Sequence, residues 1–259
     1  MQMETSLLLK TALILTTQLG VLFAGCFFVI SSAKKAYMAG RPFLGIEFIG
    51  RKNSRGELDL IPIAQTQKKE IKLSDLRWED FTKIERYYLL TFAVWLISLF
   101  CTIVFAPIST SIGLTLMTIS SITFAPILGF IMLGVDENDG LRATLLTCLI
   151  TVGAALIGMY SGIDFSFMRG FLFFGLSSLL LVGFGRIFFG MTSAMIRIKA
   201  ICGAVLFSLF LVYDFNRLKQ LSDSGINDWN TALNLAISIY LDILNLLLEI
   251  LQAMSEGKP

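Results

Sequence analysis

Two aspartates lie where the surrounding sequence is apolar. Asp214 closes the run SLFLVYD, and Asp242 lies within LNLAISIYLDILNLLLEIL. Inside a membrane a carboxylate is costly, so each of these side chains must be protonated, hydrated or partnered. Two carboxylates that meet in a low-dielectric environment cannot both ionise cheaply, and their titration then belongs to the pair. Such a pair could sense pH. It could also bind a cation, although calcium takes about six to eight oxygen ligands and two aspartates alone would form a weak site.

Asp242 belongs to a polar stripe on the last apolar run. A helix turns by about 100° per residue, so five polar side chains of this run fall on one side of it. They are Asn234, Ser238, Asp242, Asn245 and Glu249. A stripe of this kind should face the interior of a helix bundle or water, which predicts a central last helix. For the two asparagines and the serine, the alternative is a purely structural role as contacts between helices.

The two aspartates are expected to approach each other. Their apolar runs are consecutive and therefore antiparallel, and the connection NRLKQLSDSGINDWNTA has about 17 residues. Both carboxyl groups can then lie near the same side of the membrane. The alternative is local: Arg217 follows Asp214 by three residues and could pair with it on one helix face, which would leave Asp242 as a contact between helices.

Composition places these residues in a membrane protein. Of 259 residues, 55% are hydrophobic and only 15% are charged, with a mean hydropathy of +0.75. A helix that crosses the hydrocarbon needs about 20 apolar residues. Seven runs qualify, approximately 6–33, 87–106, 110–134, 141–161, 169–190, 193–213 and 231–252. The first is expected to be a retained helix, because apolar sequence continues past the lipoprotein-like FAGC at 23–26.

Several classes of function are excluded or disfavoured. The chain has no histidine, so imidazole catalysis and imidazole metal ligation are excluded. Its net charge is +2 and it has no basic stripe with interleaved aromatic residues, which gives no support for nucleic-acid binding. The four cysteines lie singly in apolar runs, without the C-x-x-C spacing of redox or zinc sites. We therefore expect no bound cofactor, apart from calcium as an ion in transit.

Residues 34–86 interrupt the membrane pattern with twelve Lys/Arg and eight Asp/Glu. This segment predicts a water-exposed insert, between a first membrane helix at 1–33 and the rest of a single membrane domain at 87–259. Alternation on both sides of RKNSRG predicts a β-hairpin, with Leu44, Ile46, Phe48, Leu58 and Leu60 on one face. The following LSDLRWEDFTKIERYY predicts an amphipathic helix, which lies either at the membrane interface or against the hairpin.

Two motifs resemble a known family. GAVLFSLFLVYDFNRLK and ISIYLDILNLLLEIL are similar to the carboxy-terminal signature of the Bax inhibitor family, also called the transmembrane Bax-inhibitor-motif family, and in particular to its bacterial calcium-leak members. Weaker similarities are LLLKTALILTT, SSITFAPIL and IDFSFMRGFLFFGL. The resemblance implies an all-α bundle of seven membrane helices, with the last enclosed by the other six. It also implies a pH-responsive passive calcium leak whose sensing aspartates are Asp214 and Asp242.

The chain departs from that family pattern in two places. Bacterial members have an arginine near the end of the second helix that latches the aspartate pair, whereas this chain has TIVFAPISTSIG there, without a cation. Candidates for a substitute are Arg217, Lys219 and Arg169. The second departure is the insert at 34–86, to which the resemblance assigns no role.

Other functions stay open at this stage. The main alternative is a non-conducting interaction protein, which modulates a membrane protease or a cell-survival pathway and contacts a membrane protein through 34–86. An intramembrane aspartyl protease would need GxGD and PAL motifs, which are absent, so no enzyme is expected. The resemblance favours the bacterial inner membrane, with an internal eukaryotic membrane as the alternative. It also places the amino terminus in the cytosol, whereas the basic residues of the insert favour the reverse orientation.

Overall fold

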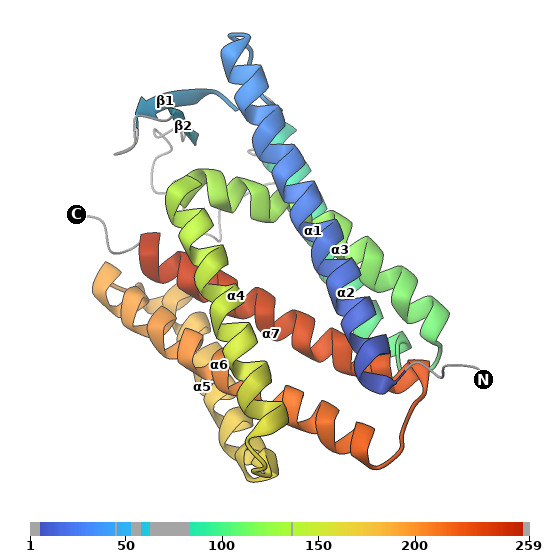
Figure 1. Ribbon diagram of the computed structural model, residues 1–259. Coiled ribbons are helices and arrows are strands. Elements are labelled where there is room, and N and C mark those ends of the chain that lie inside the picture. Colours follow the sequence, from blue (N-terminus) through green and yellow to red (C-terminus); the bar gives the residue numbers. More distant parts are fainter. Residues whose placement is uncertain (1–5, 45, 53–57, 63–82, 136, 256–259) are drawn as a thin grey trace. The chain divides into compact units, whose positions relative to one another are not determined.

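The computed structural model describes the chain except for residues 1–5, 45, 53–57, 63–82, 136 and 256–259. The described part is mainly helical (Figure 1). Its elements are α1 (Leu7–Met38), β1 (Phe48–Lys52), β2 (Leu58–Pro62), α2 (Lys83–Phe105), α3 (Thr110–Val135), α4 (Glu137–Tyr160), the 3₁₀ helix η3 (Phe165–Phe167), α5 (Met168–Phe189), α6 (Ser193–Asp223) and α7 (Trp229–Ser255).

Six of the described helices are long and apolar enough to cross a membrane. These are α1 and α3 to α7, and α2 adds a shorter apolar segment, Leu89–Phe105. The all-α membrane class is confirmed, and the helices agree approximately with the seven expected runs. The agreement follows from the hydrocarbon thickness, which sets the minimum length of a spanning helix. The chain is therefore an integral membrane protein.

Two predicted helix ends are wrong. The sixth helix does not end at 213 but continues to Asp223, so the connection to α7 is the short segment 224–228 and not 17 residues. Similarly, α1 continues through 34–38, which the sequence had suggested for the insert. In both cases the residues beyond the apolar run are mostly good helix formers, and a helix can leave the hydrocarbon without ending. Gly40, with φ of 63°, lies just after the end of α1.

The chain divides into two compact units. One unit comprises 18–105 and 112–137. In it α1 and α3 approach closely at Gly25, where a Cβ would lie 2.6 Å from that of Ala125. The buried Gln18 donates from Nε2 to Thr118 Oγ1 (2.9 Å) and accepts from Ser121 Oγ (3.1 Å). A small-residue contact and a satisfied polar network thus hold these two helices together.

The predicted β-hairpin is present in the same unit. Strands β1 and β2 pair antiparallel, with Gly50 opposite Leu60. Phe48 and Leu60 are buried in a cluster that also includes Ile46. Leu44 does not share that face: it has φ of 49°, lies in the tight turn between paired residues 43 and 46, and is 49% exposed. The prediction placed Leu44 in the alternating strand, but the turn removes it from that alternation.

A second element predicted for the insert falls mostly outside the described residues. The amphipathic helix predicted for LSDLRWEDFTKIERYY lies outside the described residues up to 82, and its last six residues form the start of α2. The water-exposed character of 34–86 and the single membrane domain stay predictions.

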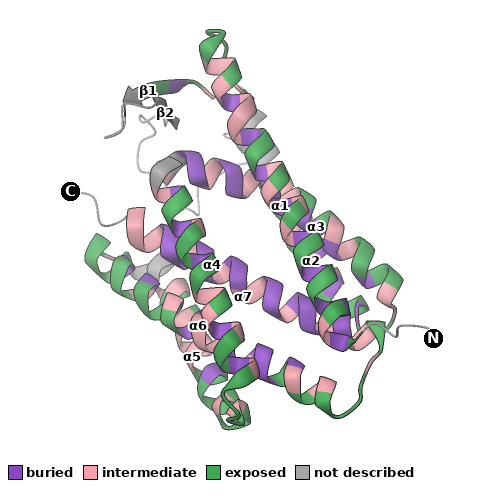
Figure 2. Ribbon diagram, viewed as in Figure 1, coloured by how far each residue is buried: buried purple, intermediate pink, exposed green. Residues whose placement is uncertain are grey.

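The second unit comprises 1–17, 106–111 and 138–259, and α6 packs most extensively against α7 in it. The two helices run antiparallel, joined by a short connection (Figure 1). α7 is the most deeply buried of the spanning helices, with 61% of its most apolar window buried, and Figure 2 shows it as alternating buried (purple) and intermediate (pink) segments. Its enclosure by six other helices stays a prediction.

Glycines set how closely helices approach in this second unit. A Cβ on Gly158 of α4 would lie 2.5 Å from the carbonyl oxygen of Val212 in α6. A Cβ on Gly175 of α5 would lie 2.7 Å from a methyl group of Leu206. α4 and α5 therefore both contact α6 at positions where no larger residue fits without a shift. These contacts fix the rotation of α6 about its axis, which decides where Asp214 points.

Candidate functional site

The structure brings Asp214 and Asp242 together. The carboxyl groups of the two residues are neighbours between α6 and α7, close enough to share a hydrogen bond. Asp214 is 5% exposed and Asp242 is half-buried. Ionised carboxylates only accept hydrogen bonds, so a hydrogen bond between these two groups would require one proton on the pair. The geometry thus places two carboxyl groups side by side in a largely buried position.

Arg217 is also close enough to Asp214 to act on it electrostatically. It makes no ion pair within 4 Å among the described residues, and its side chain lies on the exposed side of α6. Of the two alternatives, the structure shows the neighbouring aspartates and no direct ion pair between Asp214 and Arg217, which is a more distant neighbour.

The other two latch candidates lie elsewhere. Lys219 pairs with Asp223 on its own helix at 2.5 Å. Arg169 is exposed in the first turn of α5 and has no ion pair within the described part of the chain. Within the described part of the chain neither residue forms an ion pair with Asp214 or Asp242, and the role of all three cations as a latch stays a prediction.

A second acidic group of the polar stripe has a cation of its own. Glu249 of α7 forms an ion pair with Lys199 of α6, while its second oxygen, Oε2, is buried without a hydrogen-bond partner. Gly203 makes room for it, because a Cβ there would lie 2.7 Å from the Glu249 carboxyl carbon. Sequence reasoning missed Lys199. The available signal was a lysine inside an apolar run, MIRIKAICGAVLF, which requires an acidic partner or a route to water.

The rest of the stripe forms the less buried side of α7. Asn234, Ser238, Asp242 and Asn245 are all half-buried, whereas most apolar residues of the helix are buried. Asn234 donates to the backbone and side-chain oxygens of Asn230 on its own helix (2.9 and 3.0 Å). These hydrogen bonds of Asn234 therefore stay within α7. The stripe is a polar surface with partial access to the surroundings of the helix.

Asn216 is a structural residue of the site that sequence reasoning also missed. It is 7% exposed, and its Nδ2 donates to the carbonyl oxygens of Gly158 and Ile163, both at 2.9 Å. Its Oδ1 accepts from the backbone of Phe165 (3.1 Å) and from Gln220 (2.9 Å). One side chain thus ties the end of α4 and the segment before α5 to α6, two residues beyond Asp214. The motif YDFNR contained little signal for it, because Asn216 is followed at once by the charged Arg217.

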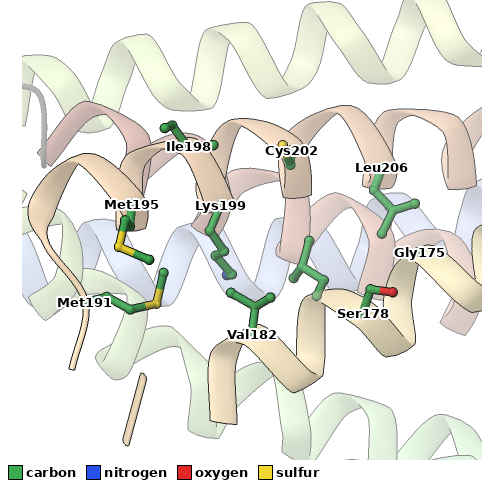
Figure 3. Close-up of a pocket in the computed structure, with 10 residues that line it drawn as sticks. Gly175, Ser178, Val182, Met191, Met195, Ile198, Lys199, Cys202 and Leu206 are labelled. Carbon is green, nitrogen blue, oxygen red and sulfur yellow. The ribbon is translucent and has the colours of Figure 1, made fainter. Parts of the chain in front are cut away.

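An apolar cavity of about 430 Å³ lies beside Lys199, between α5 and α6 (Figure 3). Its lining comprises Gly175, Ser178, Leu179, Val182, Met191, Met195, Ile198, Lys199, Cys202 and Leu206. The single charged side chain in this lining already pairs with Glu249. The cavity therefore has no free polar group that could select a ligand or support a reaction.

Outside the membrane spans, two aspartates have a lowered pKa. Hydrogen bonds from Ser166, and then from Gln220, lower the pKa of Asp164. Hydrogen bonds from Thr231 chiefly lower the pKa of Asp228, at the start of α7. Both groups therefore stay ionised at neutral and mildly acidic pH, and neither is a candidate for a pH sensor in that range.

The site does not resemble a metal centre that holds an ion permanently. No group of three or more His, Cys, Asp or Glu side chains converges among the described residues. Two carboxyl groups supply at most four of the roughly six to eight oxygens that calcium takes, so water must supply the remainder. Such incomplete coordination suits an ion that enters and leaves.

Comparison with known proteins gives the family. The family model described as "Inhibitor of apoptosis-promoting Bax1" matches residues 4–258. Relatives include a membrane protein of Vibrio cholerae (33% identical over 109 residues), Protein lifeguard 4 of Mus musculus (35% over 113) and Protein LIFEGUARD 4 of Arabidopsis thaliana (30% over 114). These matches cover 42% to 43% of this chain and 44% to 46% of the relatives, less than half of each. Because the family model matches nearly the whole chain, this integral membrane protein belongs to the Bax inhibitor family, as its two aspartate motifs predict.

Proposed function

We propose that the protein is a passive, pH-sensitive cation leak that favours calcium, and that Asp214 and Asp242 are its sensor. The observation that carries this proposal is the pair of neighbouring carboxyl groups between α6 and α7. The pair has the chemistry of a proton-controlled cation site. The proposal includes no enzymatic reaction.

The sensing step is a competition between a proton and a cation. With one shared proton, the two carboxyl groups hold α6 and α7 together through their hydrogen bond. When that proton leaves, the hydrogen bond is replaced by repulsion between two carboxylates, which a divalent cation relieves. Cation binding therefore strengthens as the pH rises, and the proposed flux falls as the pH drops through the titration of the pair.

The polar stripe of α7 supports a path for the ion. Asn234, Ser238 and Asn245 supply oxygens on the same side of the helix as Asp242, and all are partly accessible. At Glu249 the ammonium group of Lys199 already occupies the place of a cation. Glu249 thus already has a cation in direct contact, whereas the aspartate pair has none among the described residues.

The test is calcium flux into proteoliposomes between about pH 5 and pH 8. We expect the Asp214→Asn/Asp242→Asn variant to lose the pH dependence, because two amides can hydrogen-bond but cannot titrate. Asp164→Asn is the matched control, since this carboxylate is exposed and stays ionised over the same range. Unchanged flux and pH dependence in the double variant would refute the sensor.

A second candidate function is a non-conducting interaction protein. The description of the family, an inhibitor of apoptosis-promoting Bax1, favours such a role, as does the absence of a cation in TIVFAPISTSIG, where a latch was expected. Absence of flux above empty vesicles at every pH, from protein shown to be folded and inserted, would favour this candidate. Deletion within 34–86 would then be expected to remove a protein partner, whereas a leak would keep its flux.

A further inference from the structure

A groove with a different chemistry lies between α5 and α6. Its volume is about 630 Å³. Its lining comprises Arg169, Gly170, Leu172, Phe173 and Leu176 from α5, and Phe210, Tyr213 and Arg217 from α6. On each helix these residues recur at spacings of three or four, so each helix presents one continuous face to the groove. The groove combines two guanidinium groups and a phenol with an apolar wall.

Neither arginine is neutralised by a direct acidic partner. Among the described residues, Arg169 and Arg217 make no ion pair within 4 Å, whereas Lys199 and Lys219 do. Asp214 is near Arg217, but its carboxyl group is engaged with Asp242. The groove therefore carries a positive charge that is available to an external anion. Guanidinium groups match phosphate oxygens in geometry and can bind them through two parallel hydrogen bonds.

The apolar wall narrows the identity of the anion. Phe173 is 71% exposed, Leu176 and Phe210 are half-buried, and together they continue the groove away from the arginines. Arg169 lies four residues after the start of the span Phe165–Gly185, so the charged end of the groove is at one end of a membrane helix. Basic pockets between membrane helices at that depth suit lipid headgroups, and tyrosine is common there. A free phosphate ion would leave the apolar wall unused.

We propose that this groove binds an anionic phospholipid, with its phosphate on Arg169 and Arg217 and an acyl chain along Phe173, Leu176 and Phe210. The groove adjoins the proposed sensor through Arg217, but the proposal does not rest on the leak, because a lipid can occupy the groove whether or not ions pass. It gives the two arginines a ligand of their own, outside the latch role that the sequence suggested for them.

The test measures lipid retention on purified, detergent-solubilised protein by native mass spectrometry. Phosphatidylglycerol, phosphatidylcholine and inorganic phosphate serve as the three probes. We expect wild type to retain phosphatidylglycerol, and Arg169→Gln/Arg217→Gln to retain it at least tenfold less. Lys219→Gln is the matched control, because it removes a cation from the same helix outside the groove, and it should retain phosphatidylglycerol like wild type.

Each other outcome would overturn the proposal. Equal retention of phosphatidylglycerol by the double variant and wild type would place the lipid elsewhere. Equal retention of phosphatidylcholine and phosphatidylglycerol by wild type would exclude recognition of the anionic charge. Displacement of phosphatidylglycerol by millimolar inorganic phosphate would identify a free-anion site instead of a lipid site. Both arginines are exposed, so the double variant should keep the thermal denaturation temperature of wild type, and lipid loss in a folded protein is then specific.

Discussion

Lys199→Met removes the cation that neutralises Glu249 and leaves a carboxylate whose side chain is 9% exposed. Removing one member of a buried ion pair typically costs about 3–5 kcal/mol, and we expect a value near the lower limit because the Lys199 side chain is 20% exposed. Methionine keeps most of the aliphatic volume, so lost packing contributes little. The buried, unpartnered Oε2 of Glu249 leaves no second contact inside the protein to compensate for the loss.

Glu249→Gln should cost less, about 1 kcal/mol, because the lysine stem can redirect its ammonium group toward water. In the double variant Lys199→Met/Glu249→Gln no charge is stranded, so the two effects should not add, and a coupling energy of about 2 kcal/mol is expected. The assay is reversible unfolding in mixed micelles of detergent and SDS. Lys219→Met is the control, since the exposed pair with Asp223 is worth about 0–1 kcal/mol.

The same free energy of unfolding for Lys199→Met and Lys219→Met would refute a stabilising ion pair between Lys199 and Glu249. So would additivity of the two single variants in the double variant. Either result would mean that the contact between Lys199 and Glu249 is not a stabilising ion pair in the membrane protein as it folds.

Three further predictions concern the surroundings of the aspartate pair. Gly158→Ala should destabilise the protein by about 1–3 kcal/mol, because its Cβ would meet the Val212 carbonyl oxygen. Gly153→Ala on the same helix is the control: its Cβ meets nothing within 4 Å, so the change should be neutral or stabilising. Thermal denaturation in detergent compares the two variants. Asn216→Ala should cost about 1–3 kcal/mol in unfolding free energy, because buried backbone groups lose their partner, and an unchanged value would refute its role. Asp164 has a lowered pKa, so its contribution to stability is present above about pH 4 and is lost only as the pH falls through the lowered pKa. The stability difference between Asp164→Asn and wild type should therefore be constant from about pH 5 to pH 8.

The membrane class and the spacing of the helices could be predicted from sequence because they depend on local composition. A run of about 20 apolar residues has few alternatives to a membrane helix, and the polar stripe of α7 follows directly from helical periodicity. The meeting of Asp214 with Asp242 was predictable for a similar reason: consecutive spanning helices are antiparallel, and each carries one costly carboxyl group that requires a partner. The family followed from the same two motifs.

Only the tertiary structure decided the other contacts. The prediction ended the sixth helix at 213, because hydropathy reports the edge of the hydrocarbon and not the end of hydrogen-bonded backbone; the helix runs to Asp223. The partner of Lys199 and the four hydrogen bonds of Asn216 depend on the rotation of α6 against α4 and α7. That rotation is set by close approaches at Gly158, Gly175 and Gly203, whose effect depends on distant residues. A sequence specifies which side chains need a partner, whereas the packing of helices decides which partner each one meets.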